Sequence, residues 1–210
     1  QAQLDAEAER LRAAGIEVNC ELRSGDAATE LIAAAADHPT KLLVIGATGT
    51  GRGGRWLPGR VAERVAEGAP VPVLAVREAR TLISWLSGGD PLHVLCGVDF
   101  NRSSDAALNF LKGLQSIGRI ELEAAHILSE ARGSGGGAAE SASSPESPGS
   151  SAEVDAGERV FARVNEVFGE PPVRIHLPDT SGAPDEDLAR LAVGRGAGLL
   201  VVGTHQRHGW

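Results

Sequence analysis

The sequence predicts an α/β protein whose core is an open, parallel sheet with helices on both faces. Short runs of Val, Leu and Ile alternate along the chain with stretches that repeat apolar residues at helical spacing. Strands that are apolar throughout are typical of parallel sheets that are buried on both faces. Since crossovers between parallel strands are right-handed, the predicted architecture is doubly wound.

The first part of the chain contains three predicted helices and three predicted strands. Leu4, Ala8 and Leu11 recur at helical spacing, Gly15 ends that helix, and Pro39 stops the next one. In chain order we predict a helix at 2–14, a strand at 16–22, a helix that Ser24 or Asp26 caps and that ends near 37, a strand at 42–45, a helix beginning near Pro58 and a strand at 71–76.

The rest of the chain begins with a connector, 77–91, and then continues the alternation of strands and helices. Residues 129–157 are rich in Ser, Gly, Ala, Glu and Pro, and we predict a disordered insertion because they cannot bury enough apolar surface to become ordered. The remaining predicted elements are strands at 92–98, 120–128, 173–177 and 199–202 and helices at 103–114, with Ser103 as the cap, 158–168 and 185–193.

Two segments of the chain resemble each other at an offset of 157 residues. Lys41-Leu-Leu-Val-Ile-Gly46 is similar to Gly198-Leu-Leu-Val-Val-Gly203. Solenoid repeats are several times shorter, so the offset indicates a domain duplication. We expect residues 1–77 to be the C-terminal part of one copy, 78–91 a linker and 92–210 the N-terminal part of a second copy. The chain would then begin inside one copy and end inside the next.

Composition and charge argue against two classes of partner. The formal net charge is −8, which repels phosphate backbones, so we expect no nucleic-acid partner. No apolar run approaches the roughly 18 residues of a membrane helix, so we expect no membrane partner. Cys20 and Cys96 lie in apolar runs and are predicted to be buried thiols without a disulfide, which makes a cytoplasmic location the expectation.

A glycine-rich stretch from Gly46 to Arg60 follows a buried strand and precedes a helix. Ligands of parallel sheets collect at the carboxyl ends of strands, where glycines let backbone N–H groups surround an anion. Three arginines in the stretch add positive charge. It is not a Walker A loop, because no Gly-Lys-Ser/Thr closes it. Its single G-x-G-x-x-G match, beginning at Gly49, is weak because Pro58 delays the helix.

The spacing Gly46-x2-Gly49-x9-Gly59 resembles the phosphate and ribose loop in the ATP-binding branch of the universal stress protein family. The resemblance implies an open, parallel, doubly wound sheet of five strands of the adenine-nucleotide α-hydrolase type, and it covers nearly the whole chain except 77–91 and 129–157. Further segments similar to the family are Val61-Ala-Glu-Arg-Val65, Ala69-Pro-Val-Pro-Val-Leu-Ala-Val76, His93-Val-Leu-Cys-Gly-Val-Asp99 and Ser103-Ser-Asp-Ala-Ala-Leu108.

The same resemblance implies a ligand, ATP or AMP, alone or with Mg²⁺, and a role for each matching residue. Asp99 would contact the adenine, although its place at the end of a strand equally suits a cap for the following helix. The glycines would line the path of the ribose and phosphates. The implied nucleotide-binding residues are Gly46, Thr48, Gly49, Gly59, Arg60, Asp99 and Gly203.

Two departures from the family pattern keep a second interpretation open. Arg60 replaces a small hydroxyl residue, and Gln206 stands where a second glycine is expected. The chain could therefore be a degenerate module that binds no nucleotide and acts as a dimerisation or interaction scaffold. An enzyme such as an adenylyl transferase is favoured least, because no catalytic or metal-binding constellation is recognisable. We expect the last strand, 71–76, to be an exposed edge through which the two copies or two chains associate.

Overall fold

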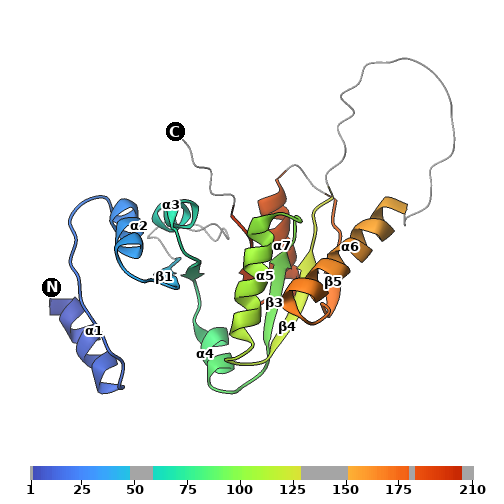
Figure 1. The fold of residues 1–210 in the computed structure, drawn as a ribbon. Helices are drawn as coiled ribbons and strands as arrows, with labels where there is room; N and C mark the ends of the chain where they lie inside the picture. Colours follow the sequence, from blue (N-terminus) through green and yellow to red (C-terminus); the bar gives the residue numbers. More distant parts are fainter. Residues whose placement is uncertain (1, 48–58, 129–150, 180–182, 205–210) are drawn as a thin grey trace, which may run out of the picture. The chain divides into compact units, whose positions relative to one another are not determined.

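The computed structural model describes residues 2–47, 59–128, 151–179 and 183–204 (Figure 1). The chain divides into two compact units, Gln1–Arg77 and Glu78–Trp210. Each unit contains a parallel sheet, as the sequence predicts. None of the helices in the described ranges combines the length and the apolar character that a membrane crossing requires.

The first unit is a two-stranded parallel sheet with three helices. Its elements are α1 (Ala2–Ala13), α2 (Ala27–Asp37), β1 (Leu43–Gly46), α3 (Arg60–Gly68) and β2 (Val73–Val76). β1 and β2 pair in parallel along their whole length. Leu43 and Ile45 of β1 pack against Ala28 of α2 and Val65 of α3, which are fully buried. The core of this unit is therefore a thin layer between one sheet face and two helices.

Asp26 determines where α2 begins and joins that helix to α3. Its Oδ1 accepts hydrogen bonds from the amide of Thr29 at 3.0 Å and from the Thr29 hydroxyl at 2.8 Å. Its Oδ2 accepts a hydrogen bond from Arg64 of α3 at 2.9 Å. Arg64 first, and then Thr29, hold the pKa of the Asp26 carboxyl well below its usual range. The predicted cap is confirmed, and it satisfies one of the amides that a helix leaves unbonded in its first turn.

The segment 16–22, predicted to be a strand, does not form one. A strand needs a neighbour that completes its hydrogen-bond ladder, and in the described part of the first unit β1 pairs only with β2. Ile16 and Leu22 are consequently 52% and 70% exposed. Cys20 is exposed as well, so the prediction that it is a buried thiol is wrong.

The second unit is a four-stranded parallel sheet in the order β5-β4-β3-β6, with the opening strand β3 in the interior. The described residues of neither unit form the predicted five-stranded sheet, since one sheet has four strands and the other has two. The elements of the second unit are α4 (Arg80–Leu86), β3 (Leu92–Gly97), α5 (Arg102–Leu114), β4 (Ile120–Ala125), α6 (Ser151–Phe168), β5 (Arg174–His176), α7 (Pro184–Arg195) and β6 (Leu199–Val201).

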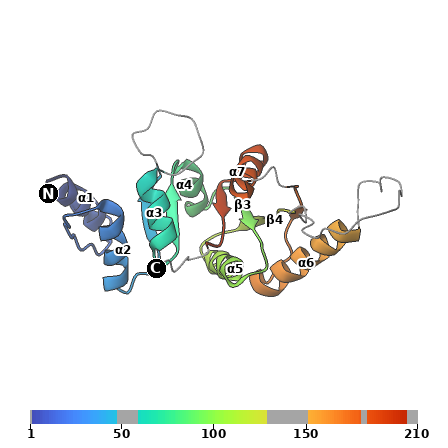
Figure 2. The ribbon, with the colours of Figure 1, turned by 90° about the horizontal axis from the view of Figure 1, so that it is seen from above.

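Different helices cover the two faces of this sheet (Figure 2). α5 and α6 lie on one face, and their fully buried residues are Leu108, Leu111, Val160, Val164 and Phe168. α7 lies on the other face, where Ala192 packs against Leu95 of β3 and Ala125 of β4. Helices on both faces make the sheet doubly wound, as the sequence predicts.

The predicted connector 77–91 contains a helix, α4. Trp85 of α4 is buried in the core of the second unit, and its Nε1 donates a hydrogen bond to the carbonyl oxygen of Arg119 at 2.8 Å. A buried indole with a satisfied N–H anchors this short helix to the sheet. The predicted linker, 78–91, therefore belongs to the second unit.

Helix α6 begins at Ser151, seven residues before the predicted start. The predicted disordered insertion is therefore wrong for 151–157, and the rest of it, 129–150, lies outside the described residues. The buried stripe of α6 extends back to Ala156, one helical turn before Val160. Burial of that small side chain helps to hold a turn whose composition alone predicts no order.

Candidate functional site

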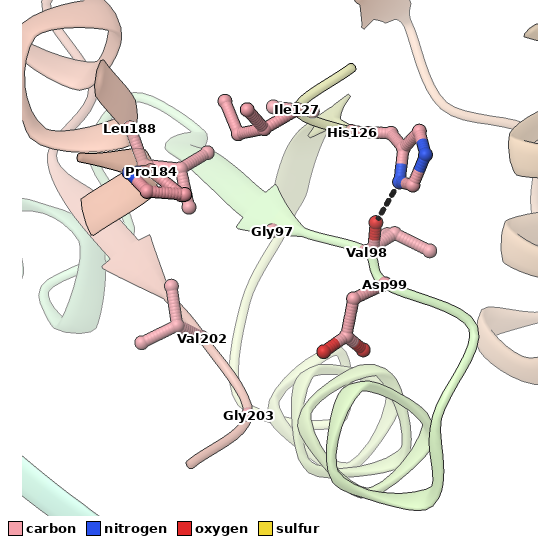
Figure 3. Close-up of a pocket in the computed structure, with 10 residues that line it drawn as sticks. Gly97, Val98, Asp99, His126, Ile127, Pro184, Leu188, Val202 and Gly203 are labelled. Atoms are coloured by element: carbon pink, nitrogen blue, oxygen red, sulfur yellow. Dashed lines mark hydrogen bonds between the residues drawn. The ribbon is translucent and has the colours of Figure 1, made fainter. Parts of the chain in front are cut away.

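A cavity of about 290 Å³ opens at the carboxyl ends of β3, β4 and β6 in the second unit (Figure 3). Open α/β sheets bind their ligands at this edge. Its walls are mostly apolar and come from strand ends on one side and the start of α7 on the other. The apolar lining residues are Val98, Ala125, Ile127, Pro184, Leu188 and Val202.

Two glycines of the cavity permit close packing. A Cβ added at Gly97 would lie 3.2 Å from Leu188 Cδ1 and 3.3 Å from Val202 Cγ1. A Cβ added at Gly203 would lie 2.3 Å from the carbonyl carbon of Ser103, which is backbone and cannot yield as a flexible side chain can. Only glycine fits at position 203, because a side chain there would collide with the backbone of the first turn of α5.

Asp99 lines the same cavity, so the structure brings together two predicted site residues, Asp99 and Gly203. The Asp99 carboxylate accepts hydrogen bonds from the Asn101 side-chain amide at 2.5 Å and from the Asn101 backbone amide at 3.3 Å. Asn101, rather than the predicted Ser103, caps α5, since its Oδ1 accepts a hydrogen bond from the Ser104 amide at 2.9 Å. Figure 3 shows the carboxylate directed toward the space beside Gly203.

His126 follows β4 and is also one of the residues that line the cavity. Its Nδ1 lies 2.7 Å from the Val98 carbonyl oxygen, so Nδ1 carries the proton and donates it (Figure 3). The imidazole also contacts the ring of Phe100, with the two centroids 4.9 Å apart. Figure 3 shows the imidazole turned away from Pro184 and Leu188, so it is not part of the apolar wall.

The other predicted site residues lie in the first unit. Gly46 ends β1, and an added Cβ there would meet no described atom within 4 Å. The amide of Gly59 donates a hydrogen bond to the carbonyl of Ala47 at 3.3 Å, which brings the two ends of the glycine-rich stretch together. Arg60 begins α3 and is exposed. The predictions for Thr48, Gly49 and Gln206 fall outside the described residues.

A buried carboxylate in β4, Glu123, was not anticipated from the sequence. Arg195 of α7 donates two hydrogen bonds to it, from Nε at 3.0 Å and from Nη2 at 2.9 Å. His176 Nε2 lies 2.6 Å from Oε2, and His93 Nε2 lies 3.2 Å from Oε1. Glu123 therefore connects β3, β4, β5 and α7, two residues before Ala125, which lines the cavity. Its partners are up to 72 positions away along the chain, so no local pattern reveals the cluster.

The partners of Glu123 stabilise its carboxylate in the charged form. The hydrogen bonds from Arg195 make the largest contribution and lower the pKa of the Glu123 carboxyl, whereas burial raises that pKa. The hydrogen bond with His176 lowers it again, and the resulting pKa is about 2. In the part of the chain that the structure describes, no group of three His, Cys, Asp or Glu side chains has the arrangement of a metal site. The Arg195 guanidinium engages both oxygens of Glu123, which is the geometry of a structural ion pair.

Cys96 confirms the other thiol prediction. It is fully buried in the centre of β3, and burial first, with the nearby Asp99 charge second, raises the pKa of its thiol to about 12. Such a thiol stays protonated at neutral pH and is a poor nucleophile.

The fold and the cavity define a class of protein. A parallel α/β sheet with helices on both faces and a hollow where its strands end is a doubly wound fold of the kind that binds small ligands at that edge. The sequence profile described as "Universal stress protein family" matches residues 1–77 and 92–210. The chain belongs to the universal stress protein family.

Solved structures share this fold at low sequence identity. A universal stress protein from Archaeoglobus fulgidus DSM 4304 matches with a TM-score of 0.60 and 22% identity over 98% of this chain and 65% of that chain. A putative universal stress protein from Pseudomonas aeruginosa UCBPP-PA14 matches with a TM-score of 0.65 and 16% identity over 99% of this chain and 68% of that chain. This chain thus spans 65% of the length of the archaeal protein.

A universal stress protein solved in complex with cAMP is 18% identical over 53% of this chain and 75% of that chain, and its TM-score of 0.29 is too low for a comparison of sites. No curated protein matches the chain significantly.

Proposed function

We propose that this chain is a stress-response regulator that binds an adenine nucleotide, ATP or AMP, at the carboxyl ends of β3, β4 and β6 and catalyses at most a slow, incidental hydrolysis of ATP. The observation that carries the proposal is the Asp99 carboxylate in the rim of an otherwise apolar cavity. Apolar walls suit the flat faces of a purine, and a carboxylate accepts hydrogen bonds from an amino group. Membership of the universal stress protein family agrees with this proposal.

The size of the cavity indicates which part of the nucleotide it takes. About 290 Å³ is at the lower end of the range of roughly 300–1,000 Å³ for small-molecule sites, so the cavity suits a nucleoside rather than a whole triphosphate. The phosphates would extend toward the first turn of α5, which Gly203 contacts and whose helix dipole favours an anion. Mg²⁺ would accompany ATP through its phosphates.

We further propose that the chain carries parts of two tandem copies of the family domain. α2 and α7 begin at Ala27 and Pro184, which are 157 positions apart, and Gly46 and Gly203 follow the same offset. In the first copy, Gly46, Gly59 and Arg60 would belong to the phosphate path.

Self-association through β2 is also proposed. β1 lies along one side of β2, and among the described residues no strand lies along the other side. An open edge of this kind is a template for pairing with a second sheet. If two chains pair there, sedimentation should give the mass of an assembly larger than one chain, and if the two copies of one chain pair there, the β2 amides should exchange slowly. A monomeric mass together with an unpaired strand at 71–76 would contradict the proposal.

One observation favours the alternative of a scaffold that binds no nucleotide. The contact between Gly203 and Ser103 accounts for that glycine without any ligand. The cytoplasmic location and the absence of nucleic-acid and membrane partners stay predictions from composition.

Calorimetric titration of the whole chain with ATP separates the two functions. We expect ATP to bind and the Asp99→Ala variant to bind about tenfold more weakly or worse, since a hydrogen bond to a charged group is lost. Asp90→Ala is the matched control, because Asp90 is an exposed carboxylate that precedes β3 at the opposite edge of the sheet. Absence of heat at millimolar ATP would leave the scaffold as the function.

A further inference from the structure

We propose that Phe100 is a positioning residue of the cavity, which holds the Asp99 carboxylate in place and gives the site its preference for a base that bears an amino group. The inference rests on the proposed nucleotide site and identifies what orients its single charged group. Three features of the second unit carry it: the backbone of Phe100, the contacts of its ring, and the hydrogen bonds that the turn makes.

The backbone of Phe100 is in a conformation that its residue type rarely adopts. Its φ is 60°, and it is the only non-glycine residue with a positive φ among the residues that the structure describes. In L-residues this left-handed region brings Cβ close to the following carbonyl oxygen, and mainly Gly, Asn and Asp tolerate it. Such a conformation persists only where the surrounding structure enforces it.

The ring of Phe100 provides that enforcement through two elements that are distant in sequence. The His126 imidazole, held by the Val98 carbonyl, contacts the ring with centroids 4.9 Å apart. The guanidinium carbon of Arg159 on α6 lies over the ring, 4.5 Å from its centroid. A cation over an aromatic face is attracted to it, and the tilted arrangement of two rings is a favourable one.

The turn at Phe100 delivers Asn101 to the Asp99 carboxylate. The two oxygens of Asp99 accept hydrogen bonds from the side-chain and backbone amides of Asn101, at 2.5 and 3.3 Å. Asn101 is itself bonded to α5 through the Ser104 amide at 2.9 Å. The carboxylate is thus tied to a helix and oriented before any ligand arrives.

An oriented carboxylate discriminates between purines. In its ionised form it accepts hydrogen bonds and donates none, so it favours a base with an amino group and opposes one with a carbonyl at the same position. If the ring of Phe100 loses its contacts, the turn can relax, the Asn101 amides leave Asp99, and the carboxylate can rotate. Affinity for the amino-bearing base should then fall, while affinity for the carbonyl-bearing base changes little.

Binding of ATP can be compared with binding of inosine triphosphate, whose purine carries an oxo group in place of the amino group of ATP. We expect the wild-type chain to prefer ATP about tenfold, as one hydrogen bond to a charged group allows, and Phe100→Leu to prefer it about twofold or less. Phe100→Tyr retains the ring and should restore the preference. Phe161→Leu is the matched control, because Phe161 is an exposed phenylalanine on α6.

A ligand-free measurement keeps the two proposals separate. In ¹H–¹⁵N spectra, the Asn101 side-chain amide of the wild-type chain should show slow solvent exchange and a hydrogen-bonded shift, and Phe100→Leu should lose both. Arg159→Gln removes one ring contact at an exposed position and should move the same signal by a smaller amount, even if Phe100→Leu does not fold.

The outcomes are distinct. If the wild-type chain binds neither triphosphate, the nucleotide function fails, and the Asn101 signal still decides whether Phe100 positions Asp99. If Phe100→Leu folds and keeps both the tenfold preference and the Asn101 signal, Phe100 has no positioning role. An unchanged Asn101 signal in Arg159→Gln would show that the contact between Arg159 and the Phe100 ring does not help to hold the turn.

Discussion

Residues 16–20 of the first unit and 173–177 of the second alternate apolar and polar residues in the same way and are 157 positions apart, yet they adopt different structures. In the second unit Arg174–His176 form β5, because β4 offers an edge on which Glu123 pairs with Arg174 and Ala125 with His176. In the first unit no described strand lies beside 16–22, and no strand forms. The comparison teaches that alternation permits a strand, whereas a neighbouring edge decides whether it exists.

The side-chain contacts of the two segments also differ. His176, at the end of β5, contacts the buried carboxylate of Glu123 at 2.6 Å. The corresponding position in the first unit is Asn19, and Glu21 nearby forms its ion pairs with Arg23 and His38 in an exposed setting. Charged groups in the second unit thus join strands to each other and to a helix, whereas those around 16–22 remain in contact with water.

The largest effect that this comparison predicts is in hydrogen exchange. The amides of 174–176 that bond to β4 should exchange at least about a hundredfold more slowly than those of 17–19, since paired amides open only with their sheet while unpaired amides exchange directly. Peptides from each segment, followed by mass spectrometry on the intact chain, give both rates in one experiment. Equal protection in the two segments would show that 16–22 has found a strand partner in solution.

A smaller effect is expected from Glu123→Gln. Loss of this buried charge leaves Arg195 and two histidines without their partner, and we expect the second unit to lose about 2 kcal/mol of unfolding free energy, less than for a fully buried pair because Arg195 is partly exposed. Glu21→Gln in the first unit is the matched control and should change stability far less. Urea unfolding followed by hydrogen exchange assigns each change to its unit.

The contribution of Glu123 to the unfolding free energy depends on pH, and it increases as the pH rises. The pKa of Glu123 falls from an ordinary 4.5 to about 2 in the folded chain, so the unfolded state binds the proton more readily. The stabilisation is complete above about pH 4.5 and is lost as the pH falls from there toward 2. In Glu123→Gln the unfolding free energy of the second unit should depend less on pH across this window. An identical slope in both proteins would mean that other carboxylates govern the acid transition.

Elements with strong local signals were predictable from the sequence. The Asp26 cap and Pro39 bracket α2 within a residue of the prediction, and the apolar run of β3 ends one residue before its predicted end. α4 was missed because it has seven residues and adjoins a glycine-rich turn, so its periodicity is too short to be recognised. Its stability comes from the burial of Trp85, which is a tertiary effect.

The candidate site was predictable only in part, for a similar reason. Asp99 and Gly203 follow strands in a recognisable pattern, and the cavity lies beside both. The roles of Phe100 and Asn101 depend on a positive φ and on contacts with distant elements, which no spacing reveals. Glu123 occupies a position that alternation alone would expose.

The contrast between the two thiols gives the native chain a built-in pair of chemical probes. Cys20 is exposed in the first unit, whereas Cys96 is enclosed within β3 of the second. An alkylating reagent or a maleimide dye should therefore modify Cys20 in the folded protein and reach Cys96 only when the second unit opens. Labelling of one site can attach a fluorophore without mutagenesis, and the rate at the other reports how often the sheet comes apart.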